Sequence, residues 1–124
     1  MRNAITSKKV ATPVGPFSHA IHSDGLVYTS GQVGQDPATG KLVERGPAAE
    51  TAQIFRNIRA VLDAGGKTLD DVIKVNVYLA NMGDFKLMND VYAEAFNAPY
   101  PARTTVAVAA LPLGASVEIE VVAR

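Results

Sequence analysis

The chain has 124 residues, the size of one domain, and we treat residues 1–124 as a single domain. Twelve Lys and Arg residues balance twelve Asp and Glu residues, so no overall charge draws the protein to nucleic acid or to an anionic membrane. Cysteine is absent, which excludes thiol catalysis, thiolate metal sites and disulfides. The N-terminal segment has no apolar leader, and no stretch approaches the ~20 apolar residues that span a bilayer. We therefore expect a cytoplasmic protein with no membrane or nucleic-acid partner.

The first third of the chain has the pattern of β-structure. Residues 16–22 and 26–33 flank a turn that contains Asp24 and Gly25. An Asp-Gly pair between two such runs favours a tight turn with positive φ, which predicts a β-hairpin. A second turn follows, and its last residues, 41–43, predict a short third strand.

The rest of the chain alternates between helix and strand patterns. Apolar residues recur with a period of 3.6 over 47–64 and again over 84–96, which predicts two amphipathic helices. Runs at 72–79, 103–110 and 117–123 predict three strands. The expected inward stripes are Ile54, Ile58, Val61 and Leu62 in the first helix, and Phe85, Met88, Tyr92 and Phe96 in the second.

The resulting order, β-β-β-α-β-α-β-β, describes an α+β domain in which two helices cover one face of a mixed sheet. The strand at 103–110 carries apolar or small residues on both of its sides, and such a strand is costly to expose. We therefore expect copies of the chain to pack their uncovered sheet faces together.

Arg103 is the strongest candidate for a functional residue, because it begins an otherwise apolar strand. A guanidinium in such a place needs an anionic partner. One interpretation is a salt bridge to a glutamate of the same or a neighbouring chain. The other is a clamp for a substrate carboxylate, to which guanidinium presents a planar fork of hydrogen-bond donors.

Two further places have both a structural and a functional interpretation. Glu118 and Glu120 leave the same side of the last strand. Either this side is solvated, or one carboxylate lies in a cleft and orients or deprotonates a water. Ser30 and Gly31 interrupt an earlier strand. They indicate either a bulge with a satisfied hydroxyl, or a binding hydroxyl beside a backbone that a ligand approaches closely.

Metal and nucleotide sites are not predicted. His19 and His22 stand at an odd offset on a predicted strand, so their rings leave opposite faces and cannot chelate together. The stretch 31–34 contains two glycines but has neither of the phosphate-loop spacings.

Five short motifs together resemble the reactive intermediate deaminase (Rid) family, whose RidA-like imine deaminases were once described as translation inhibitors. The motifs are GPFSHA at 15–20, TSGQVG at 29–34, GDFKLMN at 83–89, YPARTTV at 100–106 and VEIEVVA at 117–123. The resemblance implies a chorismate-mutase-like α+β fold and a homotrimer with active-site clefts between subunits. It also implies cofactor-independent hydrolysis of 2-imino acids or enamines, such as 2-iminobutanoate or 2-aminoacrylate, to 2-keto acids and ammonia.

The same resemblance implies roles for individual residues. Arg103 corresponds to the arginine that holds the substrate carboxylate, and Glu118 to the glutamate that directs the attacking water. Thr105, at a position often occupied by cysteine, contributes a backbone carbonyl that helps hold this water. The other implied substrate-binding residues are Phe17, Ser30, Gly31 and Asn89.

Two positions depart from the family pattern. Phe17 replaces a cleft tyrosine, so the ring is kept and the hydroxyl is lost, and His19 replaces the usual glutamine. Because of the first change we also consider a non-catalytic module that binds a small carboxylate metabolite. A third possibility, an endoribonuclease or translation inhibitor, conflicts with the zero net charge and with the lack of a basic stripe.

Overall fold

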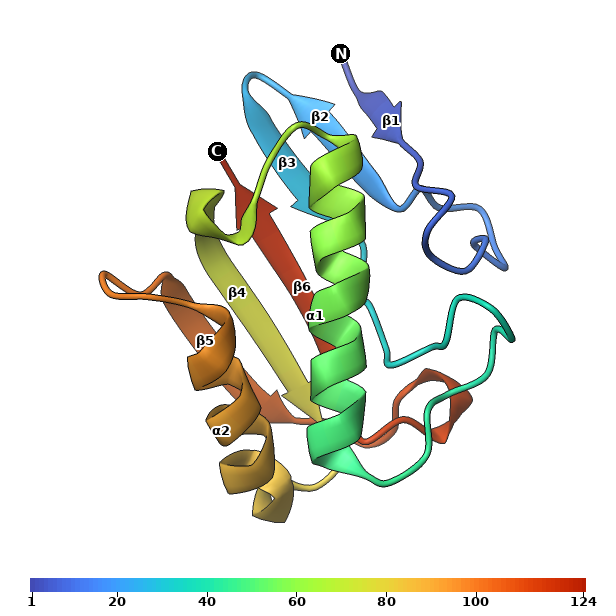
Figure 1. Cartoon of the computed structure of the whole chain (residues 1–124), viewed down its shortest axis with the longest axis vertical. Coiled ribbons are helices and arrows are strands. Elements are labelled where there is room, and N and C mark those ends of the chain that lie inside the picture. The colour runs from blue at the N-terminus through green and yellow to red at the C-terminus, as the bar shows by residue number, and fades with distance from the viewer.

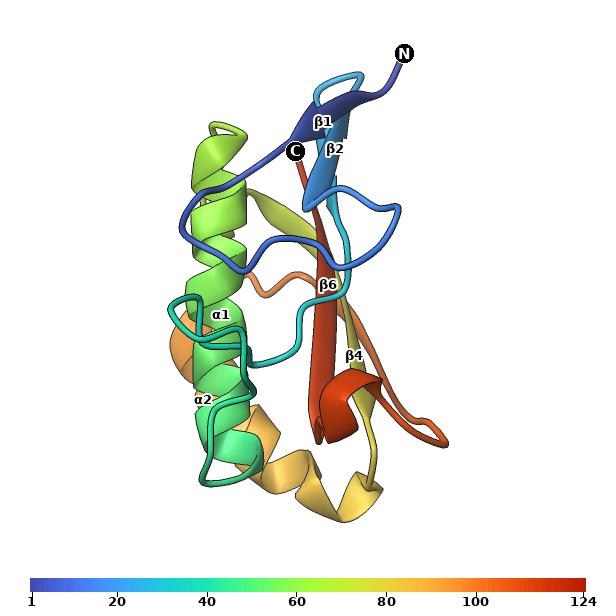
Figure 2. The same ribbon diagram turned by 90° about the vertical axis from the view of Figure 1, so that its right-hand side faces the viewer.

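The computed structural model describes residues 1–124 and has two layers (Figures 1 and 2). Six strands form one mixed sheet in the order β1-β2-β3-β6-β4-β5. Both helices lie on the same face of the sheet, which confirms the predicted α+β class. The elements are β1 Asn3–Ile5, β2 Ala20–Ser23, β3 Leu26–Thr29, α1 Pro47–Ala64, β4 Val72–Leu79, α2 Phe85–Ala95, β5 Ala102–Ala107 and β6 Val117–Ala123.

Both helices lie where their periodicity predicts. All four stripe residues of α1 are fully buried against the sheet, each contributing about 1.5–3 kcal/mol of apolar burial. In α2, Met88, Tyr92 and Phe96 are buried and Phe85 packs against the same core. The helix is one residue shorter at each end than predicted, because Asp84 belongs to a preceding 3₁₀ turn and Phe96 is extended. Neither helix is long and apolar enough to cross a membrane.

The predicted hairpin is confirmed over β2 and β3. Ser23 pairs with Leu26, so Asp24 and Gly25 form a two-residue turn. Their φ angles are 49° and 76°, the positive values that such a turn requires. The first strand of the hairpin begins at Ala20, so the preceding residues of the 16–22 run form a loop.

The 26–33 run contains a β-bulge. Tyr28 pairs with Val122 of β6, whereas Gln32 pairs with Ile119. From Tyr28 to Gln32 the chain advances by four residues, whereas their partners in β6 are only three residues apart. The run therefore contains one extra residue, which falls near Gly31. The bulge ends β3 at Thr29 and turns the following backbone toward the start of β6.

The predicted strand at 41–43 is wrong. Only an isolated bridge joins Leu42 to Gln35, because the intervening residues close a tight turn on Asp36. The third strand before α1 is instead β1, which pairs along β2 at the edge of the sheet. Its three residues are too few to show a period in the sequence.

The strand predicted over 103–110 ends early, at Ala107. Its parallel partner β4 stops at Leu79, whose carbonyl accepts one last hydrogen bond from the amide of Val108 at 2.8 Å. Beyond that point no neighbouring strand remains for pairing. Within one chain Thr104 and Val106 are exposed on the side of β5 that faces away from the helices, the side expected to pack against another copy of the chain.

Candidate active site

Arg103 lies at the start of β5, where its half-buried side chain reaches toward α2. Its Nη1 donates a hydrogen bond of 2.7 Å to Oδ1 of Asn89. The guanidinium carbon stands 4.5 Å from the ring centroid of Tyr92 and 5.5 Å from that of Phe85. Stacking and the Asn89 bond fix the orientation of the guanidinium while leaving further N–H groups free.

No carboxylate of the chain neutralises Arg103. The only salt bridge in the structure joins Lys86 to Asp90 on the surface of α2. The intramolecular ion pair considered for Arg103 is therefore not formed. Beside Arg103 is a cavity of about 510 Å³, large enough for a small carboxylate. It is lined by Asn89, Tyr92, Ala93, Tyr100, Pro101 and Arg103.

Two hydroxyl groups near this part of the fold are buried without a hydrogen-bond partner, those of Tyr92 and Thr105. Burial raises the pKa of the Tyr92 hydroxyl, and the nearby Arg103 charge opposes this shift. Tyr92 therefore stays neutral at physiological pH, and its ring faces the guanidinium as an uncharged aromatic. Thr105 shares a side of β5 with Arg103, two residues further along the strand.

Glu118 lies near the start of β6 and points away from the helices, since its neighbours Val117 and Ile119 are fully buried in the core. It is half-buried and lines a second cavity of about 360 Å³. Burial raises the pKa of Glu118, and the negative charge of Glu120 raises it further. A carboxylate of raised pKa beside a cavity can accept a proton from water.

Gly31 lies directly against the Glu118 carboxylate. A Cβ built on Gly31 would overlap Oε2 of Glu118 and come within 2.8 Å of its carboxyl carbon. The segment is fixed beside β6 by two hydrogen bonds between Gln32 and Ile119, of 2.8 and 3.0 Å. A side chain at this bulge would therefore displace the Glu118 carboxylate, and glycine lets the carboxylate keep its position.

Phe17 and Ser30 lie close to this second cavity. The ring of Phe17 is half exposed and lines both the Glu118 cavity and an adjoining hollow of about 550 Å³, which also contains Ser30. The Ser30 hydroxyl donates to the carbonyl of Ser18 at 2.6 Å. Ser30 is thus the satisfied serine of a bulge, and its oxygen can still accept one hydrogen bond.

The predicted site residues form two groups within one chain. Arg103 and Asn89 line the cavity beside α2, whereas Phe17, Gly31 and Glu118 line the other, and the two cavities share no residue. The groups also lie on different sides of the sheet, since Arg103 contacts α2 and Glu118 points away from the helices. The sequence did not indicate this separation.

His19 holds the N-terminal arm against the Glu118 cavity. Its buried ring accepts a hydrogen bond at Nδ1 from the Ser7 amide (3.1 Å) and donates from Nε2 to the Ala11 carbonyl (2.8 Å). Residues 11–14 of this arm form one wall of the cavity. His19 therefore has a structural role. The side-chain amide of glutamine, the usual residue at this position in the family, also provides a hydrogen-bond acceptor and a donor.

We expect His19→Gln to unfold at nearly the same temperature as the parent and His19→Leu to lose roughly 2–6 kcal/mol of unfolding free energy. Leucine leaves a buried amide and a buried carbonyl unpaired, and each costs ~1–3 kcal/mol. Thermal or urea unfolding of the three proteins at one concentration measures this. Equal stability of the leucine variant would contradict the role of His19.

Two polar residues that the sequence did not single out support the Glu118 side of the fold. Glu50, buried in the first turn of α1, accepts a hydrogen bond of 2.8 Å from the amide of Ser116, two residues before Glu118. Asn57, also buried, donates to the carbonyl of Gln35 at 3.0 Å. Both lie within the buried surface of α1, and a polar residue within an apolar stripe is the signal that could have revealed them.

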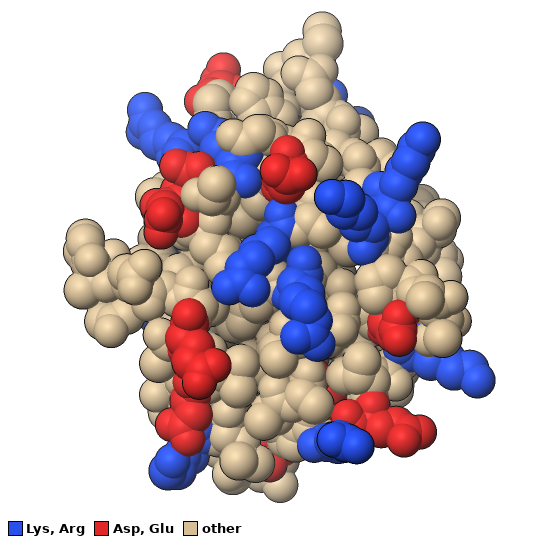
Figure 3. Space-filling model, viewed as in Figure 1, with Lys and Arg blue, Asp and Glu red and all other residues tan.

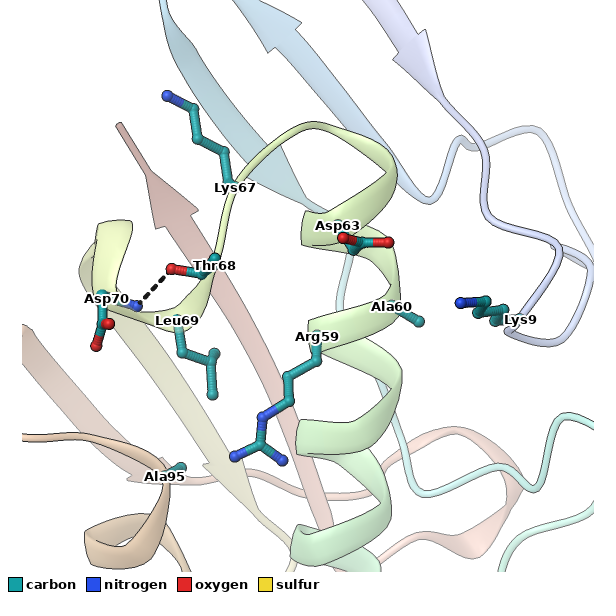
Figure 4. Close-up of a pocket in the computed structure, with 9 residues that line it drawn as sticks. All are labelled: Lys9, Arg59, Ala60, Asp63, Lys67, Thr68, Leu69, Asp70 and Ala95. Carbon is teal, nitrogen blue, oxygen red and sulfur yellow. Dashed lines mark hydrogen bonds between the residues drawn. The ribbon is translucent and has the colours of Figure 1, made fainter.

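A further cavity of about 510 Å³ lies at the C-terminal end of α1 but contains none of the predicted site residues (Figure 4). Its charged side chains include Lys9, Arg59 and Lys67, which point in different directions, together with two aspartates. Positive and negative side chains are interspersed over the helix-bearing face as a whole (Figure 3). The structure has no cluster of three or more His, Asp or Glu side chains arranged to hold a metal.

The structure is thus a two-helix α+β domain in which an arginine without a carboxylate partner lies beside one cavity and a glutamate of raised pKa lies beside another. The family model described as endoribonuclease L-PSP matches residues 7–124. The chain therefore belongs to this family, which the five motifs identify as the Rid family.

Several proteins of known name are similar to this chain in sequence and in structure. A 2-iminobutanoate/2-iminopropanoate deaminase of Bos taurus is 44% identical over 123 residues, covering 99% of this chain and 90% of the relative. The crystal structure of RidA from an Antarctic Psychrobacter has a TM-score of 0.94 at 44% identity, covering 98% of each chain. Escherichia coli TdcF, solved with bound serine, has a TM-score of 0.92 at 31% identity, covering 98% of this chain and 97% of its own.

Proposed function

We propose that the chain hydrolyses 2-imino acids, or their enamine tautomers, to 2-keto acids and ammonia without a cofactor. The observation that carries the proposal is the Arg103 guanidinium, which is oriented by Asn89 and Tyr92 but has no carboxylate partner in its own chain. A 2-imino acid supplies such a carboxylate next to its reactive carbon. The deaminase names of relatives at more than 40% identity support the same reaction class.

In this mechanism Arg103 binds the carboxylate and holds the imine carbon beside a water. Glu118, aided by the backbone carbonyl of Thr105, orients the water and accepts its proton as the oxygen bonds to the carbon. With the imine nitrogen already protonated, the product is a neutral carbinolamine. Glu118 returns its proton to the amino nitrogen, the C–N bond breaks as ammonia leaves, and the hydroxyl loses its proton to solvent to become the keto oxygen. Because an imine is already electrophilic, positioning supplies most of the acceleration.

The site is proposed to form between subunits of a homotrimer. Arg103 and Glu118 line separate cavities of one chain, so a substrate that contacts both requires the two halves to come from neighbouring copies. The sheet face without helices presents the exposed side chains of Tyr28 and Val106, which a second copy can cover. Light scattering should then give three times the mass of one chain. A cytoplasmic location is part of the same proposal.

Ammonia release from freshly generated 2-iminobutanoate, measured above its spontaneous hydrolysis, tests the proposed reaction. If the protein does not accelerate the reaction, the alternative of a non-catalytic module that binds a small carboxylate metabolite remains. The observation that supports this alternative is Phe17, which lines the Glu118 cavity without the phenol hydroxyl of the family's tyrosine. RNA incubated with the same purified protein tests the third possibility, suggested by the description of the family. We expect no cleavage, given the interspersed charges of the helix face.

The pH dependence should report Glu118. Its pKa is raised, and the carboxyl must be ionised to accept the proton, so kcat/KM should fall with decreasing pH at values above the ~4.3 of an ordinary glutamate. Glu120→Gln removes a neighbouring negative charge and keeps an oxygen for the Tyr78 hydroxyl, which donates to Glu120 at 2.7 Å. The fall should then move to lower pH. Comparing both proteins on one substrate cancels titration of the imine. A fall in the parent at or below the pKa of an ordinary glutamate would exclude Glu118 as the titrating group, and an unmoved profile in Glu120→Gln would exclude the contribution of Glu120.

A further inference from the structure

Leu113 has an unusual position beside the Glu118 cavity. It lies in the turn between β5 and β6 with φ 60° and ψ 16°, in the left-handed region that side chains other than glycine rarely adopt. The turn is closed by a hydrogen bond from the Ala115 amide to the Pro112 carbonyl at 3.0 Å. Packing within the chain does not account for this conformation, because Leu113 is 60% exposed and is not part of the core.

The Leu113 side chain lines the cavity that contains Glu118. Val14, 94% exposed, and Phe17, 50% exposed, line the same cavity from the N-terminal arm. Three apolar residues from two distant segments thus line the cavity that also contains the carboxylate. Apolar residues exposed together around a cavity indicate a binding surface.

No residue of the cavity provides a positive charge that could pair with an acidic ligand. Its lining contains no lysine or arginine, and Glu118 is its only charged residue. Both ring nitrogens of His19 are engaged by backbone groups, and the Gln35 side chain donates to the carbonyl of Gly40 at 2.9 Å. A second carboxylate on a ligand would therefore face Glu118 without compensation.

We propose that Leu113, together with Val14 and Phe17, forms the wall that receives the substrate side chain, so that the site selects 2-imino acids with branched or longer apolar side chains. This rests on the proposed function. With the carboxylate on Arg103 of one subunit and the imine carbon in front of Glu118 of the next, the remaining substituent of that carbon extends along this wall. Acidic 2-imino acids are rejected by Glu118, and the smallest ones leave the wall uncovered.

The test compares kcat/KM, above spontaneous hydrolysis, for imines generated in situ by amino acid oxidases from leucine, alanine and glutamate. In the parent protein the leucine-derived imine should be preferred by roughly tenfold or more over each of the others, since even one methylene can change the rate by about tenfold. Leu113→Ala should reduce the preference over the alanine-derived imine by roughly tenfold, chiefly through the leucine-derived substrate.

Two further variants separate selectivity from folding. Leu113→Gly should show the same loss of preference and be at least as stable as the parent, because glycine suits a φ of 60°. Leu87→Ala, which shortens an exposed side chain of α2 outside the cavity, should leave the preference unchanged. Equal loss on all substrates, or dissociation of the oligomer, would assign Leu113 to subunit packing and overturn the inference.

The outcomes distinguish the inference from the proposed function. A parent protein that accelerates none of the imines would refute the proposed function itself. A parent that hydrolyses imines, but whose preference does not depend on residue 113, would refute only the assignment of the wall.

Discussion

Replacing Arg103 with alanine should lower kcat/KM for 2-imino acids by on the order of 10²-fold or more. Each charge-assisted hydrogen bond to a carboxylate is worth ~1.5–3 kcal/mol, and a guanidinium can make two in parallel. The loss should appear in both kcat and KM, because the same contact binds the substrate and holds its imine carbon in place. Ammonia release measured over a range of imine concentrations separates the two constants.

Arg103→Lys and Lys86→Ala are the controls for this result. Lysine keeps the charge but lacks the planar fork and the stacking on Tyr92, so most of the activity should still be lost. Lys86 is paired with Asp90 on the surface of α2, outside the cavity, and its removal should not affect turnover. The fold of the Arg103 variants should persist, because the core residues remain in place. Full activity of Arg103→Ala on a carboxylate-bearing imine would contradict the clamp.

The Glu118→Gln variant should lose about 10²–10⁴-fold in kcat with little change in KM. Glutamine has the same shape and still fits beside Gly31, but it cannot accept the proton of the attacking water. Substrate binding should persist because the carboxylate is held by Arg103. Single-turnover measurements on pre-formed imine report the chemical step directly.

Glu44→Gln serves as the matched control, since Glu44 is exposed and lines neither of the two candidate cavities. It makes the same change of carboxylate to amide and should behave as the parent. Parental kcat in Glu118→Gln would remove the water-directing role and leave positioning by Arg103 as the source of any acceleration.

The parts of the fold that sequence predicts well are those set by local chemistry. The two helices follow from apolar residues at a period of 3.6, and the hairpin follows from Asp24 and Gly25, whose positive φ few other residue pairs allow. The predicted order of strands and helices agrees with the observed one although one strand was misplaced. β1 is stabilised by pairing with β2, and the end of β5 is set by the end of β4, so both depend on contacts distant in sequence.

The candidate site divides in the same way. Arg103 could be named from the chemistry of a cation on an apolar strand, whereas the chemistry of the last strand left Glu118 and Glu120 open and the resemblance to the Rid family selected Glu118. The distribution of Arg103 and Glu118 over two cavities could not be predicted, because it depends on β4 lying between β6 and β5 and on the face to which each side chain points. The role of His19 also required the structure, since its two backbone partners lie 12 and 8 residues away in the N-terminal arm.

The guanidinium of Arg103, stacked on an aromatic ring and unneutralised by its own chain, attracts small carboxylates whatever the chemistry of the neighbouring carbon. A 2-keto acid retains the carboxylate of the imine from which it is formed. If Arg103 is the proposed carboxylate clamp, the product should compete with the next substrate molecule for the same cation, and turnover should slow as the keto acid accumulates. Acetate or formate in an assay buffer should act in the same direction, so the measured rate should depend on which anions are present.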